Sequence, residues 1–183
     1  MRSISLAVSF LSLATASLEA QQSPPLVYIE EGACPFECCQ YGRWTAAARI
    51  SLRAEPTVDA AIVGTIEVGD SVTAETGHVR SSPTAFLVRS PFEGFQRGDT
   101  VWVLNYLGEG YFNVWYQGTT REAGLGFSPY GGTSGTRCAG CSHGELVSEL
   151  DWTWWVRIRL SSGAVGWTSD TDELYGKDAC ACG

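Results

Sequence analysis

Seven cysteines give this 183-residue sequence its clearest capacity for chemistry, and they fall into three clusters. The clusters are Cys34, Cys38 and Cys39; Cys138 and Cys141, in a Gly-rich stretch; and Cys180 and Cys182. Thiols in an oxidising compartment normally pair, and a bridge from the first to the last cluster would contribute about 4–5 kcal/mol in the chain-entropy model. Because seven is odd, one thiol is left over or pairs between molecules. The sequence therefore predicts disulfides but does not define their connectivity.

A metal site is the alternative use of the same side chains. Cys138 and Cys141 with His143 nearby, together with Cys180 and Cys182, contain enough ligands for zinc or copper(I). The last pair is separated by one residue, however, which is not a zinc spacing, and no histidine directly follows Cys141, as haem attachment requires. Disulfides are favoured, and the sequence assigns no metal and no cofactor.

Catalytic constellations are not recognisable in the sequence. A Cys–His hydrolase needs a nucleophilic cysteine that opens a helix beside an activating histidine, and no cysteine here begins an apolar helical run. The histidines are His78, in a turn-like stretch, and His143. Carboxylates are plentiful, but nothing singles out a catalytic pair. We therefore expect that the protein is not an enzyme.

The N-terminal 20 residues have the layout of a secretory signal peptide. A positive start at Arg2 precedes an apolar run over residues 4–14, and small residues allow cleavage after Ala16 or Ala20. The run is shorter than the roughly 20 apolar residues of a membrane-spanning helix, and no later segment is apolar enough to span. The expected location is secreted or periplasmic. The net charge of −8 argues against a nucleic-acid partner and an anionic membrane surface.

Short strands separated by turns account for most of the sequence beyond residue 44. Residues 48–53 alternate apolar and polar side chains, the period of a half-buried strand, and similar runs follow at 62–66, 100–104, 112–116 and 154–160. The 21 glycines, and seven each of Trp, Tyr and Phe, favour turns and strands. The sequence thus predicts an all-β fold, a small barrel or sandwich with short or no helices.

Three segments together resemble the bacterial SH3-like domain family. Residues 50–56 (ISLRAEP) are similar to its opening strand, residues 63–72 (VGTIEVGDSV) to its Gly-Asp turn segment, and residues 155–167 (WVRIRLSSGAVGW) to its closing hairpin. The resemblance covers about 35 residues and implies small SH3-like barrels. In this family such domains bind cell-wall peptides, peptidoglycan or protein segments, usually beside a catalytic domain.

Two features complicate a single domain of this kind. The opening and closing segments lie about a hundred residues apart, and the Gly69-Asp70 turn is echoed by Gly98-Asp99. Either one barrel carries a large insertion or two barrels are present. We favour a Cys-containing arm over residues 21–43, a first unit over 44–91, a second unit over 92–174 with a Gly-rich inserted loop at 121–150, and a Cys-containing tail over 175–183.

A surplus of aromatic residues is the best sequence clue to function. Alternation places Trp154 and Trp155 on opposite faces of a strand, and Tyr106 and Tyr111 flank a turn at residues 108–110. Exposed aromatic side chains can form a groove for a peptide or a platform for sugar rings. Tyr106, Tyr111 and Trp154 are the predicted ligand-binding residues of an exported module that recognises a cell-envelope ligand, peptidoglycan or a peptide segment. A structural role in the envelope and a periplasmic metal-binding role remain as alternatives.

Overall fold

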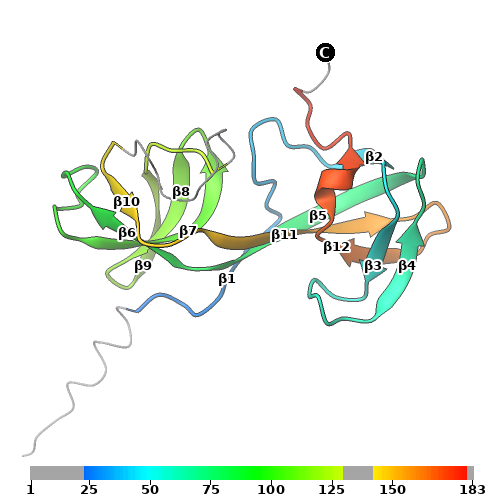
Figure 1. The fold of residues 1–183 in the computed structure, drawn as a ribbon, viewed down its shortest axis with the longest axis horizontal. Helices are drawn as coiled ribbons and strands as arrows, with labels where there is room; N and C mark the ends of the chain where they lie inside the picture. Colours follow the sequence, from blue (N-terminus) through cyan, green and yellow to red (C-terminus); the bar gives the residue numbers. More distant parts are fainter. Residues whose placement is uncertain (1–22, 130–141, 181–183) are drawn as a thin grey trace, which may run out of the picture.

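Strands dominate the computed structural model, which describes residues 23–129 and 142–180 (Figure 1). Within those ranges the single helical element is a short 3₁₀ helix, η1 (Thr171–Glu173), so the all-β prediction is confirmed. None of the described helical segments is long and apolar enough to cross a bilayer. The predicted signal peptide lies outside the described residues.

The described strands form two sheets. The larger sheet has the order β13-β2-β5-β11-β12-β3-β4, and β1 also pairs with β5. Its strands are β1 (Tyr28–Glu31), β2 (Gly42–Ala46), β3 (Ile50–Arg53), β4 (Ile62–Ile66), β5 (Ser71–Ser82), β11 (Asp151–Arg159), β12 (Val165–Thr168) and β13 (Leu174–Tyr175). The smaller sheet has the order β10-β6-β7-β8-β9. Its strands are β6 (Thr84–Val88), β7 (Thr100–Gly108), β8 (Tyr111–Tyr116), β9 (Thr119–Gly124) and β10 (Gly144–Leu146).

The smaller sheet is inserted into a hairpin of the larger one. Strands β5 and β11 pair antiparallel from Asp151 opposite Ser82 to Arg159 opposite Thr73. All strands of the smaller sheet lie between these two in the sequence. In Figure 1, β5 and β11 run as long neighbouring ribbons from the lobe of the larger sheet toward the lobe of the smaller one. One unit therefore carries the other at the end of a hairpin.

A similar turn precedes one long strand in each sheet, β5 in the larger and β7 in the smaller. The turn before β7 joins two paired strands, whereas the turn before β5 joins β4 and β5, which are not neighbours in their sheet. Each turn contains a glycine with positive φ, Gly69 at 85° or Gly98 at 94°. An aspartate follows each glycine, and its Oδ2 accepts a backbone N–H three residues earlier, at 2.9 Å for Asp70 and 2.8 Å for Asp99. Because positive φ favours glycine, both turns carry the same Gly-Asp pair, and this repeat can be recognised in the sequence.

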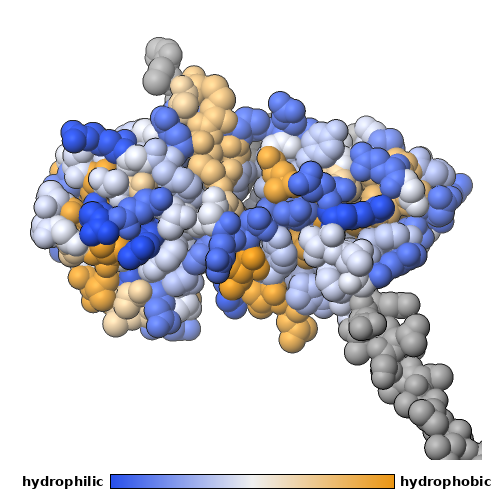
Figure 2. All heavy atoms as spheres, turned by 180° about the vertical axis from the view of Figure 1, so that it is seen from behind, coloured by the Kyte–Doolittle hydropathy of each residue, from blue (hydrophilic) through white to orange (hydrophobic). Residues whose placement is uncertain are grey.

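Each sheet encloses its own apolar core. The core of the larger sheet is formed by Trp44, Ala46, Ile50, Leu52, Ile66, Val72, Ala74, Val156, Ile158 and Leu174. The core of the smaller sheet is formed by Phe86, Val88, Phe95, Val101, Val103, Tyr106, Phe112, Val114, Ala123, Leu125 and Leu146. In the view from behind, blue surface predominates and orange surface is divided into separate patches (Figure 2). The two cores together contain most of the buried apolar residues among those described.

The predicted division at residues 91 and 92 does not match the division between the sheets. β6 lies before that boundary but pairs with β7, and β11 lies after it but pairs with β5. Alternation of apolar residues shows where strands occur but not which strand each one pairs with. The predicted Gly-rich loop at 121–150 is also shorter than expected, since β9 ends inside it and β10 occupies Gly144–Leu146. Residues 130–141 lie outside the described part.

The N-terminal arm and the C-terminal tail are integral to the larger sheet. β1 pairs with β5, Tyr28 opposite Ser81, so the arm contains a strand that the sequence analysis did not anticipate. Cys38 and Cys180, 142 residues apart, form a disulfide, and Cys34 and Cys39 form a second. A bridge between the first and last cysteine clusters, one of the pairings that the sequence left open, is therefore present. The backbone N–H of Ala179 also donates to the Cys38 carbonyl at 2.8 Å.

Candidate functional site

The arm is fixed across the β5–β11 hairpin by one backbone carbonyl. The Ala33 carbonyl accepts a hydrogen bond from Trp154 Nε1 at 3.1 Å and another from the Tyr41 hydroxyl. Burial raises the pKa of Tyr41, so its hydroxyl keeps the proton that it donates. These two bonds join Ala33 of the arm to Trp154 of β11 and to Tyr41, the residue directly before β2.

A glycine in β5 makes room for this convergence. A methyl group added to Gly77 would lie 2.7 Å from Trp154 Nε1, from the Trp155 carbonyl oxygen and from the Tyr41 hydroxyl. The carbonyl belongs to the paired strand β11 and cannot move without disturbing the sheet. Only glycine lets the strand pass beneath the two aromatic side chains.

Trp154 is the centre of an aromatic cluster. Its ring centroid lies 5.8 Å from that of Phe36 at an interplanar angle of 85°, and 6.0 Å from that of Trp44. Tyr41 lies 6.3 Å away. These are edge-to-face and tilted arrangements that aromatic pairs prefer. The cluster joins the buried core at Trp44 to the half-buried Phe36 on the arm.

A cleft of about 500 Å³ opens beside this cluster. Three parts of the chain that are far apart in sequence form its walls: the arm, the β5–β11 hairpin, and η1 with the tail. The lining residues are Pro35, Phe36, Glu37, Val79, Trp152, Trp154, Thr171, Asp172, Lys177 and Asp178. Five of these residues are apolar and five are polar or charged, so the cleft is more polar than a typical small-molecule pocket.

Acidic side chains outnumber basic ones around the cleft. The Lys177 ammonium donates to the Thr171 carbonyl at 2.6 Å and lies 3.5 Å from Asp172 Oδ1. Lys177 is therefore held by the wall itself, whereas Glu37, Asp172 and Asp178 contribute carboxylates. The surplus of negative charge favours a ligand that carries a basic group.

Glu37 links the cleft to the smaller sheet. Its Oε1 accepts the Tyr106 hydroxyl at 2.7 Å and the backbone N–H of Glu109 at 2.7 Å. These bonds, the backbone one first, lower the pKa of Glu37. A second cavity, of about 330 Å³, lies on this side and includes Glu37, Tyr106 and Glu109 in its lining. Glu37 is thus shared by both cavities.

The three aromatic residues predicted to bind a ligand are not brought together. Trp154 lines the larger cleft. Tyr106 lines the smaller cavity, but it is only 2% exposed, and its ring packs in the core of the smaller sheet. Tyr111 is 48% exposed and lines neither cavity. The expectation of a single exposed aromatic surface is therefore not met for Tyr106.

Sequence reasoning did not find the arm and tail residues of the cleft. Phe36 and Glu37 lie between cysteines in the arm, for which the sequence predicts only disulfides. Asp172 lies in a polar segment with no recognisable motif. The cysteine clusters were the available signal, because a bridge between the first and the last of them, a pairing that the sequence left open, places residues 34–39 beside residues 178–180. Both histidines pack against aromatic rings. The ring centroids of His78 and Trp167 are 4.5 Å apart, and those of His143 and Phe92 are 4.4 Å apart.

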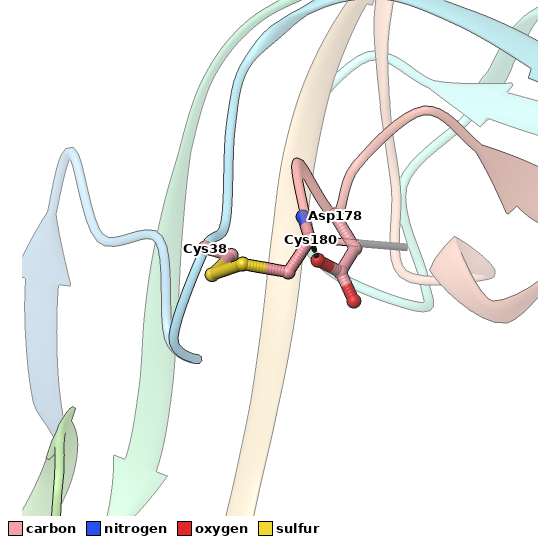
Figure 3. A group of neighbouring side chains, drawn as sticks. All are labelled: Cys38, Asp178 and Cys180. Carbon is pink, nitrogen blue, oxygen red and sulfur yellow. Dashed lines mark hydrogen bonds between the residues drawn. A yellow bond between two sulfur atoms is a disulfide. The ribbon is translucent and has the colours of Figure 1, made fainter. Parts of the chain in front are cut away.

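One group of potential metal ligands occurs among the described residues, and it consists of Cys38, Asp178 and Cys180. Figure 3 shows the two sulfur atoms bonded to each other, with the Asp178 carboxylate beside them. Asp178 accepts the backbone N–H of Cys180 at 2.8 Å. A bonded sulfur pair offers no thiolate to a metal, so these residues act as a staple in this structure. Cys138, Cys141 and Cys182, named above as disulfide candidates and possible ligands, lie outside the described residues.

Comparisons with known proteins give no match to a family model, to a curated protein or to a solved structure. The resemblance to bacterial SH3-like domains therefore remains a prediction from the sequence segments.

Proposed function

We propose that the protein is an exported, non-catalytic binding module of the bacterial SH3-like kind, which holds a cell-envelope ligand in the cleft beside Trp154. The ligand is peptidoglycan or a peptide segment. The observation that carries the proposal is the cleft itself, which is lined by aromatic side chains from the arm and from β11 and by three carboxylates. Aromatic rings pack against sugar faces and extended peptides, and carboxylates attract amino groups.

The cross-linking of the arm supports this assignment in two ways. Disulfides persist in oxidising compartments outside the cytoplasm, in agreement with the predicted signal peptide. Cys34 and Cys38 also bracket the residues that the arm contributes to the cleft. A wall fixed before the ligand arrives loses less conformational entropy on binding.

Phe36 is the best aromatic residue to test. Trp154 also anchors the arm and packs against Trp44, so its replacement by alanine would disturb the fold together with the cleft. Phe36 is half-buried on the arm, and its contact with Trp154 is edge-on. Phe36→Ala therefore removes cleft surface with little change to either core.

The test is cosedimentation of the purified protein with isolated peptidoglycan. We expect wild-type protein to bind and Phe36→Ala to bind roughly 3–10-fold more weakly, as loss of one aromatic contact implies. Tyr111→Ala, which removes an exposed ring outside both cavities, is the matched control and should bind as wild type. Equal binding by wild type and Phe36→Ala, or a loss confined to Tyr111→Ala, would refute the cleft as the site.

A further inference from the structure

A third pocket, which shares no lining residue with the cleft or with the cavity at Tyr106, lies on the outer face of the larger sheet. The register places Arg43 of β2 and Arg159 of β11 on either side of Thr73 of β5. All three residues are exposed, whereas residues next to them in the same strands (Trp44, Val72, Ala74 and Ile158) are buried. The three side chains therefore lie on the solvent face of the sheet. Side chains directly opposite one another on adjacent strands start about 5 Å apart. Both guanidinium groups can therefore reach the space above Thr73.

The pocket at this position measures about 290 Å³ and is rich in donors. Besides the two arginines it is lined by three hydroxyl side chains, those of Ser71, Thr73 and Ser161. Carboxylate side chains are not among its lining residues. A hydroxyl can donate to an anion, and a guanidinium presents a planar fork of donors.

The local charge differs in sign from that of the whole chain. Glu75 occupies the irregular step in the pairing of β5 with β11, and it lies 2.5 Å from Arg159 Nε and 3.6 Å from Arg157 Nη1. Glu75 thereby orients Arg159, but its single negative charge balances only one of the two positive charges of Arg157 and Arg159. Within the described residues, Arg43 forms no ion pair. This face is thus positive in a protein whose net charge is −8.

We propose that this pocket binds a phosphate group. The guanidinium fork of Arg43, the remaining N–H groups of Arg159 and three hydroxyls exceed what the two oxygens of a carboxylate accept, and they match the several oxygens of a phosphate. Arginine binds phosphate through paired N–H donors. Arg159 donates from Nε to Glu75 at 2.5 Å and from Nη1 to the Gly163 carbonyl at 3.5 Å, which fixes its guanidinium group at the pocket. Arg43 supplies the charge that is not otherwise balanced. This site is independent of the ligand bound in the cleft.

The experiment is an NMR titration of ¹⁵N-labelled protein with inorganic phosphate at constant ionic strength, maintained with chloride. We expect saturable shifts at the amides of Ser71, Thr73 and Arg159. Arg43→Gln should raise the dissociation constant at least tenfold, while Arg97→Gln, which removes an equal charge from the exposed turn of the smaller sheet, should leave it unchanged. Thermal melting of both variants checks that the fold is retained.

Two further probes identify the source of the phosphate. Saturable, Arg43-dependent binding of glycerol 3-phosphate supports a small phosphate ester as the ligand. Arg43-dependent sedimentation with phosphatidylglycerol vesicles supports the same pocket acting on a lipid headgroup. Shifts that do not saturate, that spread over all surface arginines, or that persist unchanged in Arg43→Gln show charge screening only and would overturn the proposal.

Discussion

Replacing Cys38 and Cys180 together by serine removes the bond that ties the N-terminal arm to the C-terminal tail. The closed loop spans 142 residues, for which the chain-entropy expression gives about 5 kcal/mol at 25 °C. The Cys34–Cys39 loop spans only 5 residues, for which the same expression gives about 2 kcal/mol. The first double variant should therefore lose about 3 kcal/mol more unfolding free energy than Cys34→Ser with Cys39→Ser.

Urea denaturation of the oxidised proteins, followed by tryptophan fluorescence, measures both losses. Each double variant removes both partners, so neither leaves a new unpaired thiol from the broken bridge. Equal losses in the two variants would refute the reasoning, because they would mean that the long bridge does not constrain the unfolded chain. A loss only in Cys34→Ser with Cys39→Ser would show that the pairing itself is different.

Three further outcomes test the elements that shape the site. Gly77→Ala should cost about 1–3 kcal/mol by overpacking, since its methyl would lie 2.7 Å from a backbone carbonyl; Gly64→Ala, with 3.5 Å to its nearest atom, should be close to neutral in the same urea experiment. Glu37 has a lowered pKa in the folded protein, so its contribution to stability is present above its ordinary pKa and is lost as pH falls through the lower, folded value. NMR shifts of the amide to which it bonds should report that midpoint, and Glu37→Gln should abolish the transition. Asp99→Ala should destabilise more than Asp70→Ala by about 1 kcal/mol, since its carboxylate also accepts a tyrosine hydroxyl at 2.6 Å; equal melting temperatures would contradict this.

Local sequence patterns predicted the strands well and their partners poorly. The alternation at residues 154–160 and the Gly-Asp turns correspond to β11 and to equivalent turns in both sheets. The return of β11 to β5, across the whole smaller sheet, was not predictable because pairing depends on contacts between distant segments. The expected boundary at residues 91 and 92 was misplaced for this reason.

The candidate site was predictable only in part. Trp154 was identified from alternation, and it does lie half-exposed beside a cleft while Trp155 is buried. Tyr106 could not be recognised as a core residue, since its hydroxyl bonds to Glu37 of an arm 69 residues away. The cleft walls come from segments that meet through the β1–β5 pairing, the hydrogen bonds to the Ala33 carbonyl, the Cys38–Cys180 disulfide and the pairing of the tail, and no local pattern encodes these contacts.

The central claim is that the cleft beside Trp154 binds an envelope ligand. NMR titration of the ¹⁵N-labelled protein with soluble peptidoglycan fragments tests it most directly, because the indole N–H signals report the cleft without mutation. We predict saturable shifts of the indole signals of Trp152 and Trp154 and of the Phe36 and Lys177 amides. Unchanged spectra, or shifts confined to residues outside the cleft, would contradict the account.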